Sequence, residues 1–198
     1  MAPTSPRREV LPVTAGRGNS LPDLFGERQL LTQEHLKEVL QYDLSTGIFT
    51  WAHPTSRRIS VGDIAGSIKT SGHRQIQIDR SRYAAHRLAF LWVLGRWPNK
   101  EVDHVNGVKD DNRWSNLREA TRQQNMRNRP MSSANSSGFK GVYRDPSSNK
   151  WVAAIGINKT PKYLGAYESK IDAAKAYDKA ASDIFGEYAK TNQSMGLL

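Results

Sequence analysis

The stretch that most constrains the fold runs from Glu101 to Arg129. An Asp-His pair sits between two valines, and a long polar loop follows before a short apolar-centred run at residues 116–118. Thr121 and Gln124 have the spacing of a capping box, so a helix is expected to begin there. The order strand, loop, strand, helix brings four polar side chains towards one point: Asp103, His104, Asn116 and Asn125.

These four side chains suit metal-assisted hydrolysis of a phosphodiester. Asp103 and Asn125 offer the hard oxygen ligands that Mg²⁺, or another divalent cation such as Mn²⁺, accepts. His104, with an ordinary pKa of about 6.5, can take a proton from water at neutral pH. Asn116 can hold the imidazole or the loop by hydrogen bonding. The alternative is a strand end followed by ordinary turns, since Asp, Asn and Gly are common turn residues.

The ordered set closely resembles the HNH nuclease motif, the ββα-metal fold, in the form found in phage homing endonucleases. The matching runs are V-D-H-V-N-G, D-N-R-W-S-N-L-R and T-R-Q-Q-N, with Asn125 in place of the third histidine. The resemblance implies Asp103 and Asn125 as metal ligands, His104 as general base and Asn116 as the orienting residue. It also implies a phosphate clamp from nearby arginines, Arg113 or Arg118.

The charge and the cysteine count narrow the class of partner. Net charge is +10 with a pI near 9.9, which is typical of a nucleic-acid binder. No segment approaches the ~20 apolar residues of a membrane-spanning helix, so no membrane partner is expected, and no protein partner is evident. The chain has no cysteine, which excludes cysteine-bound zinc, and zinc is not expected. A reducing cytoplasm fits, that of a bacterial host if the gene is phage-borne.

The first part of the chain divides into an arm and a nuclease domain. Residues 1–29 are rich in Pro, Gly, Ser and Arg and predict a disordered basic arm. Residues 30–129 form the nuclease domain, in which a small sheet and helix precede the motif. Its elements are expected as helices at 33–41 and 86–96 and as strands at 48–51, 63–69 and 75–79.

Two residues at the start of the second helix join the candidate site. The run Y-x-x-H-R and the apolar segment after it also resemble the segment that precedes the motif in phage HNH enzymes. This resemblance places His86 and Arg87 near the active site. For His86, the alternative is a buried, hydrogen-bonded histidine at a helix start.

A second module follows a linker at residues 130–138, whose small polar residues and proline mark a domain boundary. Residues 139–191 predict three strands, at 139–144, 150–157 and 163–167, and a helix at 169–185 with alanines at three- and four-residue spacing. A three-stranded antiparallel sheet packed on one helix is expected, with residues 192–198 as a tail. The whole chain is therefore predicted to be α+β.

The second module resembles the apetala-type DNA-binding domain of plant ethylene-response factors, through K-G-V-Y, K-W-V-A-A-I, Y-L-G-A-Y and D-A-A-K-A-Y-D-K-A-A. In that family the sheet lies in the major groove of duplex DNA. The matching sheet positions are Tyr143, Arg144, Lys150, Trp151, Lys159, Lys162 and Tyr163. Tyr143 and Asp145 stand where the plant pattern has arginines, and Ala154 and Gly156 replace Glu and Arg. We therefore expect a base preference that differs from that of the plant family. For Trp151, packing in the core is the alternative to contact with DNA.

The resulting prediction is a metal-dependent, homing-type DNA endonuclease acting on double-stranded DNA, by nicking or by double-strand cutting. A catalytically inactive regulator that binds double-stranded DNA is the alternative, although Asp103 and His104 are both present. An RNA-binding module is a further alternative, because basic sheets with aromatic residues also stack unpaired bases. An interaction protein without a nucleic-acid function would leave the charge of +10 unexplained.

Overall fold

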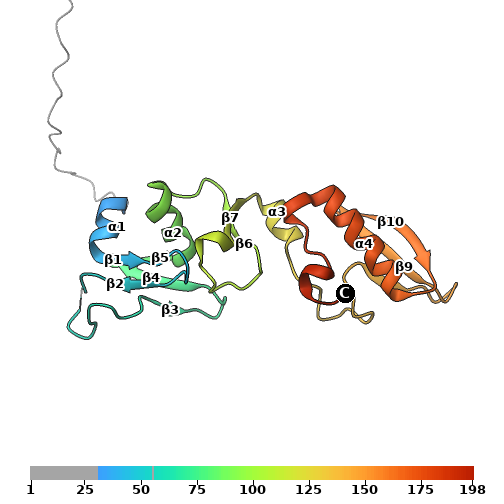
Figure 1. Cartoon of the computed structure of the whole chain (residues 1–198), viewed down its shortest axis with the longest axis horizontal. Helices are drawn as coiled ribbons and strands as arrows, with labels where there is room; N and C mark the ends of the chain where they lie inside the picture. The colour runs from blue at the N-terminus through green and yellow to red at the C-terminus, as the bar shows by residue number, and fades with distance from the viewer. Residues whose placement is uncertain (1–30, 55) are drawn as a thin grey trace, which may run out of the picture. The chain divides into compact units, whose positions relative to one another are not determined.

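The computed structural model describes residues 31–198 except residue 55, so the predicted arm at residues 1–29 lies outside the described residues. Helices and small antiparallel sheets alternate along this part of the chain (Figure 1), which confirms the α+β class. None of the helices described is long and apolar enough to cross a membrane.

The first half contains two small sheets and two helices that share one apolar core. The elements are α1 (Gln33–Val39), β1 (Leu40–Tyr42), β2 (Phe49–Trp51), β3 (Ser67–Ile68), β4 (Arg74–Ile78), β5 (Ser81–Ala84) and α2 (Ala85–Leu94). Strand β1 pairs with β2, and β4 lies between β3 and β5. The core is built from fully buried side chains, including Leu36, Phe49, Ile76 and Leu88.

Three elements of this half differ from the sequence expectation. The helix predicted at 33–41 ends at Val39, because Leu40 adopts an extended conformation and begins β1. The predicted helix at 86–96 ends at Leu94, because Gly95 adopts φ 67° and its N–H bonds back to Leu91 O. A left-handed glycine closes the helix before Trp97 and Pro98 can do so. The predicted strand at 63–69 is reduced to a single bridge between Ile64 and Thr50 and to the two residues of β3.

The stretch from Glu101 folds as two strands and a helix. Strand β6 (Glu101–His104) pairs antiparallel with β7 (Leu117–Ala120), so that Asp103 faces Arg118. A short 3₁₀ turn, η1 (Trp114–Asn116), precedes β7, and α3 (Arg122–Arg127) follows it. The predicted capping box is present: the Thr121 hydroxyl accepts from the backbone of Gln124, whose side chain accepts from the backbone of Thr121. The local order is therefore that predicted from the sequence.

The second half has a sheet and core of its own. Strands β8 (Val142–Arg144), β9 (Trp151–Ile157) and β10 (Thr160–Tyr167) form a sheet in the order β10-β9-β8, and α4 (Lys170–Phe185) packs on it, followed by the short turns η2 (Gly186–Tyr188) and η3 (Gln193–Met195). Alanines 173, 174 and 181 of α4 are buried against the sheet.

Strand β8 begins later than predicted, at Val142 rather than at Phe139. Gly141 adopts φ +74°, and a Cβ there would lie 1.9 Å from the ring of Tyr177. The chain therefore turns on a residue without a side chain where it passes under α4.

Candidate active site

One pocket of about 480 Å³ collects three of the four side chains on which the sequence prediction rests. Asp103 and His104 line it from β6, and Asn125 lines it from α3. Asn128, at the end of α3, and His73, just before β4, line it as well, together with the basic side chains of Lys109 and Arg129. A carboxylate, imidazoles, carboxamides and cations thus surround one hollow.

His104 is buried at 5% exposure, and its ring has a defined tautomer. Its Nε2 lies 3.3 Å from Oδ1 of Asn112, whose Nδ2 in turn donates to Asp110 O at 3.1 Å. Because Asn112 Oδ1 can only accept, Nε2 carries the proton and Nδ1 keeps a lone pair. Burial lowers the pKa of His104 below its usual value, against the opposing effects of Asn112 and Asp103. The imidazole is therefore neutral at pH 7.

The sequence analysis expected Asn116 to hold the imidazole or the loop by hydrogen bonding. In the structure, two asparagines share these roles. Asn116 donates from Nδ2 to Asp111 O at 2.7 Å and to Asn106 Oδ1 at 3.0 Å, and it accepts from Asn106 N. It thus braces the loop, and the imidazole is held by Asn112. Sequence reasoning missed Asn112, which lies in a D-D-N run that has the composition of a surface turn.

Asp103 is 3% exposed, and its two oxygens differ in their contacts. Oδ2 accepts from Arg118 Nε at 2.9 Å and Nη2 at 2.7 Å, and from Asn128 Nδ2 at 3.1 Å. Oδ1 accepts from Asn128 alone among the described residues, at 2.9 Å. Oδ1 therefore has the greater spare capacity to bind a cation. Arg118, predicted as a phosphate clamp, is here the ion-pair partner of the carboxylate.

The carboxamide nitrogen of Asn125 donates to Glu101 Oε2 at 2.8 Å. No donor among the described residues reaches its Oδ1, so this oxygen is available. Asn128, which the sequence reading did not single out, also donates to His104 O at 2.8 Å. The signal for Asn128 was present as N-x-x-N, because residues three apart on a helix share a face.

Residues of β1 and of the turn after it contact the backbone around Asn112. The Tyr42 hydroxyl donates to Asn112 O at 2.6 Å, and Trp114 N donates to Leu44 O at 3.1 Å. Gly47, at φ +75°, approaches so closely that a Cβ would lie 2.2 Å from Arg113 N. The turn after β1 is therefore packed directly against the segment that fixes His104.

The other basic and histidine candidates of this half lie at different distances from the pocket. Arg113 is held by Asp111, with Nη2 2.6 Å from Oδ2. The guanidinium of Arg87 lies 5.9 Å from the ring centre of Trp97 and is not among the pocket-lining residues. The ring centre of His86 lies 5.3 Å from that of His104, so His86 is close to the site.

In the second module the strand register separates the predicted DNA contacts into two faces. Tyr143 is opposite Val152, and Tyr163 is opposite Ala154, on the face away from α4; these tyrosines are 50% and 63% exposed. Arg144 is opposite Trp151, whose ring packs with the core cluster of Phe139 on the α4 side. Lysines 150, 159 and 162 are exposed, and Lys150 pairs with Glu168 at 2.9 Å.

Residues 83–127 match the family model described as HNH endonuclease. The match begins in β5 and covers α2, β6, β7 and α3, and it includes Asp103, His104, Asn116 and Asn125. We refer to residues 83–127 as the HNH segment.

Two relatives cover different shares of the chain. The chain is 32% identical to an uncharacterised HNH endonuclease of Acanthamoeba polyphaga mimivirus over 120 residues, 60% of this chain and 62% of the relative. It is 41% identical to an ethylene-responsive transcription factor of Arabidopsis thaliana over 63 residues, 31% of this chain and 24% of that protein. The chain thus spans less than two thirds of either relative. The family match and the viral relative support a nuclease, and the plant match is compatible with a DNA-binding second module.

Proposed function

We propose that this protein is a metal-dependent endonuclease that hydrolyses phosphodiester bonds of double-stranded DNA. The observation that carries the proposal is the pocket that Asp103, His104 and Asn125 line together, within the HNH segment. The same pocket presents Lys109 and Arg129, which supply positive charge for a phosphate backbone.

The donor set fits a hard divalent cation such as Mg²⁺ or Mn²⁺. Asp103 Oδ1 and the Asn125 carboxamide oxygen are the ligands with spare capacity, and both residues line the pocket. A bound cation would stabilise the negative charge that develops on the phosphate and on the leaving oxygen. Arg118 orients the buried Asp103 carboxylate through its two bonds to Oδ2.

His104 has the properties of a general base. Its Nδ1 lone pair accepts the proton of the attacking water, while Nε2–H stays bonded to Asn112. The imidazolium formed in this step is stabilised by the carboxylates of Asp103, Asp110 and Asp111, which raise the pKa of His104 against its burial. Asn116 takes no direct part and holds the loop that carries Asp110 and Asp111.

Binding of the duplex is assigned to the second module, whose helix-free sheet face presents Tyr143 and Tyr163. A strand pair fits the major groove, where side chains reach base edges. The tyrosines and small residues on this face favour apolar base contacts over paired guanine contacts. The arrangement is that of a site-preferring enzyme of the homing type, whose cleavage centre and recognition surface lie on separate cores.

Cleavage of supercoiled plasmid in Mg²⁺ or Mn²⁺ tests this function. We expect nicking or linearisation by the full chain, its loss in EDTA, and a fall of about 10²- to 10⁴-fold in rate for His104→Ala. His53→Ala is the matched control, because His53 lies outside the pocket and contacts the backbone of Glu38.

Equal activity in His104→Ala and His53→Ala would exclude His104 as the base. Tight duplex binding without cleavage under any divalent cation would instead identify a regulator. The ion pair of Arg118 with Asp103 is the observation that favours this second function, since it already satisfies one oxygen of the expected metal ligand.

A further inference from the structure

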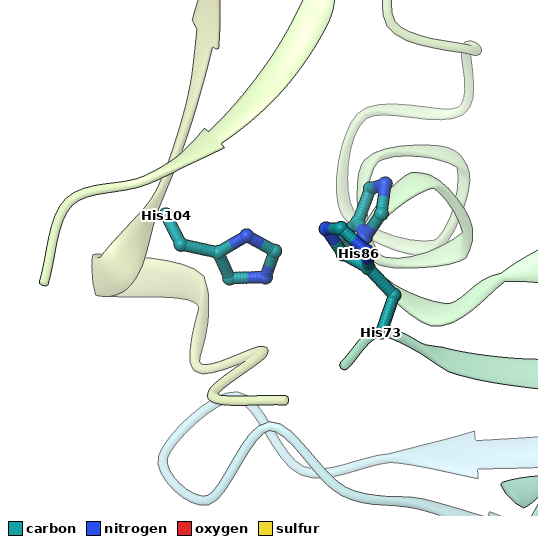
Figure 2. Close-up of side chains that lie close together, drawn as sticks. All are labelled: His73, His86 and His104. Carbon is teal, nitrogen blue, oxygen red and sulfur yellow. The ribbon is translucent and has the colours of Figure 1, made fainter. Parts of the chain in front are cut away.

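Three of the five histidines of the chain meet in one cluster, and two of them, His73 and His104, line the pocket. His73, His86 and His104 each present a ring nitrogen, and these three nitrogens lie within 4.8 Å of one another. The ring centres are 5.0 Å apart for His73 and His86, 5.3 Å for His86 and His104, and 5.7 Å for His73 and His104. Figure 2 shows the rings of His73 and His86 side by side, facing that of His104.

The cluster is held from three separate parts of the chain. His86 lies in the first turn of α2, and His104 ends β6, where Asn112 fixes its ring. His73 precedes β4, and its turn is tied to the loop after β6 by two contacts. Arg74 forms a double hydrogen bond with Asp110 at 3.0 Å and 3.0 Å, and Lys109 Nζ donates to Ser71 O at 2.8 Å. The three imidazoles are therefore brought together by structure that does not depend on a ligand.

One nitrogen of the cluster lacks a hydrogen-bond partner in the described part of the chain. Nδ1 of His86 is buried there without any donor or acceptor in reach. A buried polar atom left unpaired costs free energy, so such atoms often mark a missing ion or water. Burial and the neighbouring histidines lower the pKa of His86 to about 3, and burial also lowers the pKa of His73. The unpaired Nδ1 of His86 is thus a neutral ligand atom within the cluster that His73 and His104 complete.

We propose that His73, His86 and His104 form a Zn²⁺ site, distinct from the Mg²⁺ position at Asp103 and Asn125. Imidazole nitrogens suit Zn²⁺ and related transition ions, whereas Mg²⁺ prefers oxygen. Tetrahedral Zn–N bonds of about 2.0–2.1 Å set the nitrogens roughly 3.4 Å apart, so modest side-chain rotation closes the site. Water takes the fourth position. The nearby carboxylates of Asp103, Asp110 and Asp111 are each paired with an arginine, and Lys109 and Arg87 add positive charge. The three imidazole nitrogens, rather than local negative charge, therefore carry the site.

A shared histidine makes zinc an inhibitor of cleavage, a consequence that rests on the function proposed above. The lone pair that His104 uses to accept a proton is the one it gives to Zn²⁺, because Nε2–H is held by Asn112. Zinc and base catalysis therefore exclude each other. The absence of cysteine, which predicted no zinc, removes thiolate ligands alone and leaves a three-histidine site possible.

Co²⁺ titration of the full, chelator-stripped chain tests the site without reference to activity. We expect the intense visible bands of four-coordinate Co²⁺, their displacement by Zn²⁺, and at least a roughly 100-fold weaker affinity in His73→Ala. His53→Ala is the matched histidine control and should leave the bands unchanged. His73→Gln replaces His73→Ala if circular dichroism shows that the alanine variant fails to fold.

Two outcomes would overturn the site. Bands that survive in His73→Ala but vanish in Asp103→Asn would place the ion at the oxygen site, and the absence of any bands would mean that the cluster binds no metal. In a second arm, Zn²⁺ inhibits Mg²⁺-dependent nicking by the wild type, and His73→Ala relieves the inhibition. Failure of nicking altogether would count against the nuclease alone, because the Co²⁺ bands report the site independently.

Discussion

At the scale of single residues, the candidate site depends on which atom each asparagine presents. Asn112 presents an acceptor to His104, Asn116 uses both ends of its amide on the loop, and Asn128 presents donors to Asp103 and His104 O. The sequence predicted residue types and their convergence. It could not predict the separate roles of these three asparagines, because their side chains differ in tertiary contacts and not in local sequence pattern.

The tautomer of His104 gives a direct test. Asn112→Asp would accept the Nε2–H bond through a carboxylate, stabilise the imidazolium and raise the pKa of His104. Asn112→Leu would remove the acceptor, leave the Nε2 proton unpaired and free the ring to turn. We expect cleavage to fall by about tenfold or more in the leucine variant, and the acid limb of the pH–rate profile to move to higher pH in the aspartate variant. Unchanged profiles in both variants, with intact folds, would show that Asn112 does not position the base.

At the scale of elements, the ββα unit was the most predictable part of the chain. The capping box at Thr121 indicated the start of α3, and the valines on either side of the Asp103-His104 pair indicated β6. Prediction failed where a tertiary contact decided the boundary. Gly141 delays β8 because the ring of Tyr177 lies against it, and β3 is short because the segment before it makes only one bridge. His73 went unnoticed for the same reason: it is a turn residue whose partners lie on α2 and β6.

Strand β7 contains a carboxylate whose titration reports the integrity of this unit. Glu119 is bound by Arg96 and by the backbone N–H of Asn99, which lower its pKa to about 2. Between that value and its ordinary one the unfolded chain binds more protons than the folded chain, so stability falls as pH drops from about 4.5 towards 2. Glu119→Gln should be less stable at neutral pH and lose this part of the acid dependence, measured as urea midpoints. Glu168→Gln is the control and should keep the acid dependence of the wild type. Glu168 is an exposed carboxylate that directly follows β10.

At the scale of the whole molecule, the chain combines a net charge of +10 with separate apolar cores in its two halves. General attraction to phosphate needs only the net charge, whereas a preference among sites needs a surface in contact with bases. The helix-free face of the β8–β10 sheet is that surface in our proposal, and Tyr143 and Tyr163 are its large exposed side chains. The sequence did not predict that these tyrosines and Trp151 lie on opposite faces of the sheet. A bulge near Tyr163 shifts the strand register and interrupts the alternation of side chains between the two faces.

Loss of these tyrosines should weaken duplex binding and spare the chemistry. We expect the double variant Tyr143→Ala, Tyr163→Ala to bind cleavable DNA roughly tenfold more weakly in the His104→Ala background, since one base contact is worth about 1–3 kcal/mol. With His104 restored, the cleavage rate at saturating DNA should match that of the wild type. Ile171→Ala removes an exposed apolar side chain from α4 and serves as the control. Equal DNA affinities for the His104→Ala protein, the tyrosine variant and the Ile171→Ala variant would show that the tyrosine face does not bind the duplex.

The contact of Gly47 with the backbone of Arg113 limits how the HNH segment can be moved into other proteins. The HNH segment, residues 83–127, does not include all the residues that support it. Tyr42, Gly47 and Arg74 precede the segment in the chain, and each contacts the loop from Asp110 to Arg113. The HNH segment is therefore not a portable cassette. A chimaera that carries residues 83–127 in another scaffold therefore needs a host turn with a glycine at the position that contacts this loop. Likewise, replacement of the β1–β2 turn in this chain requires a compensating change in the loop from Asp110 to Arg113.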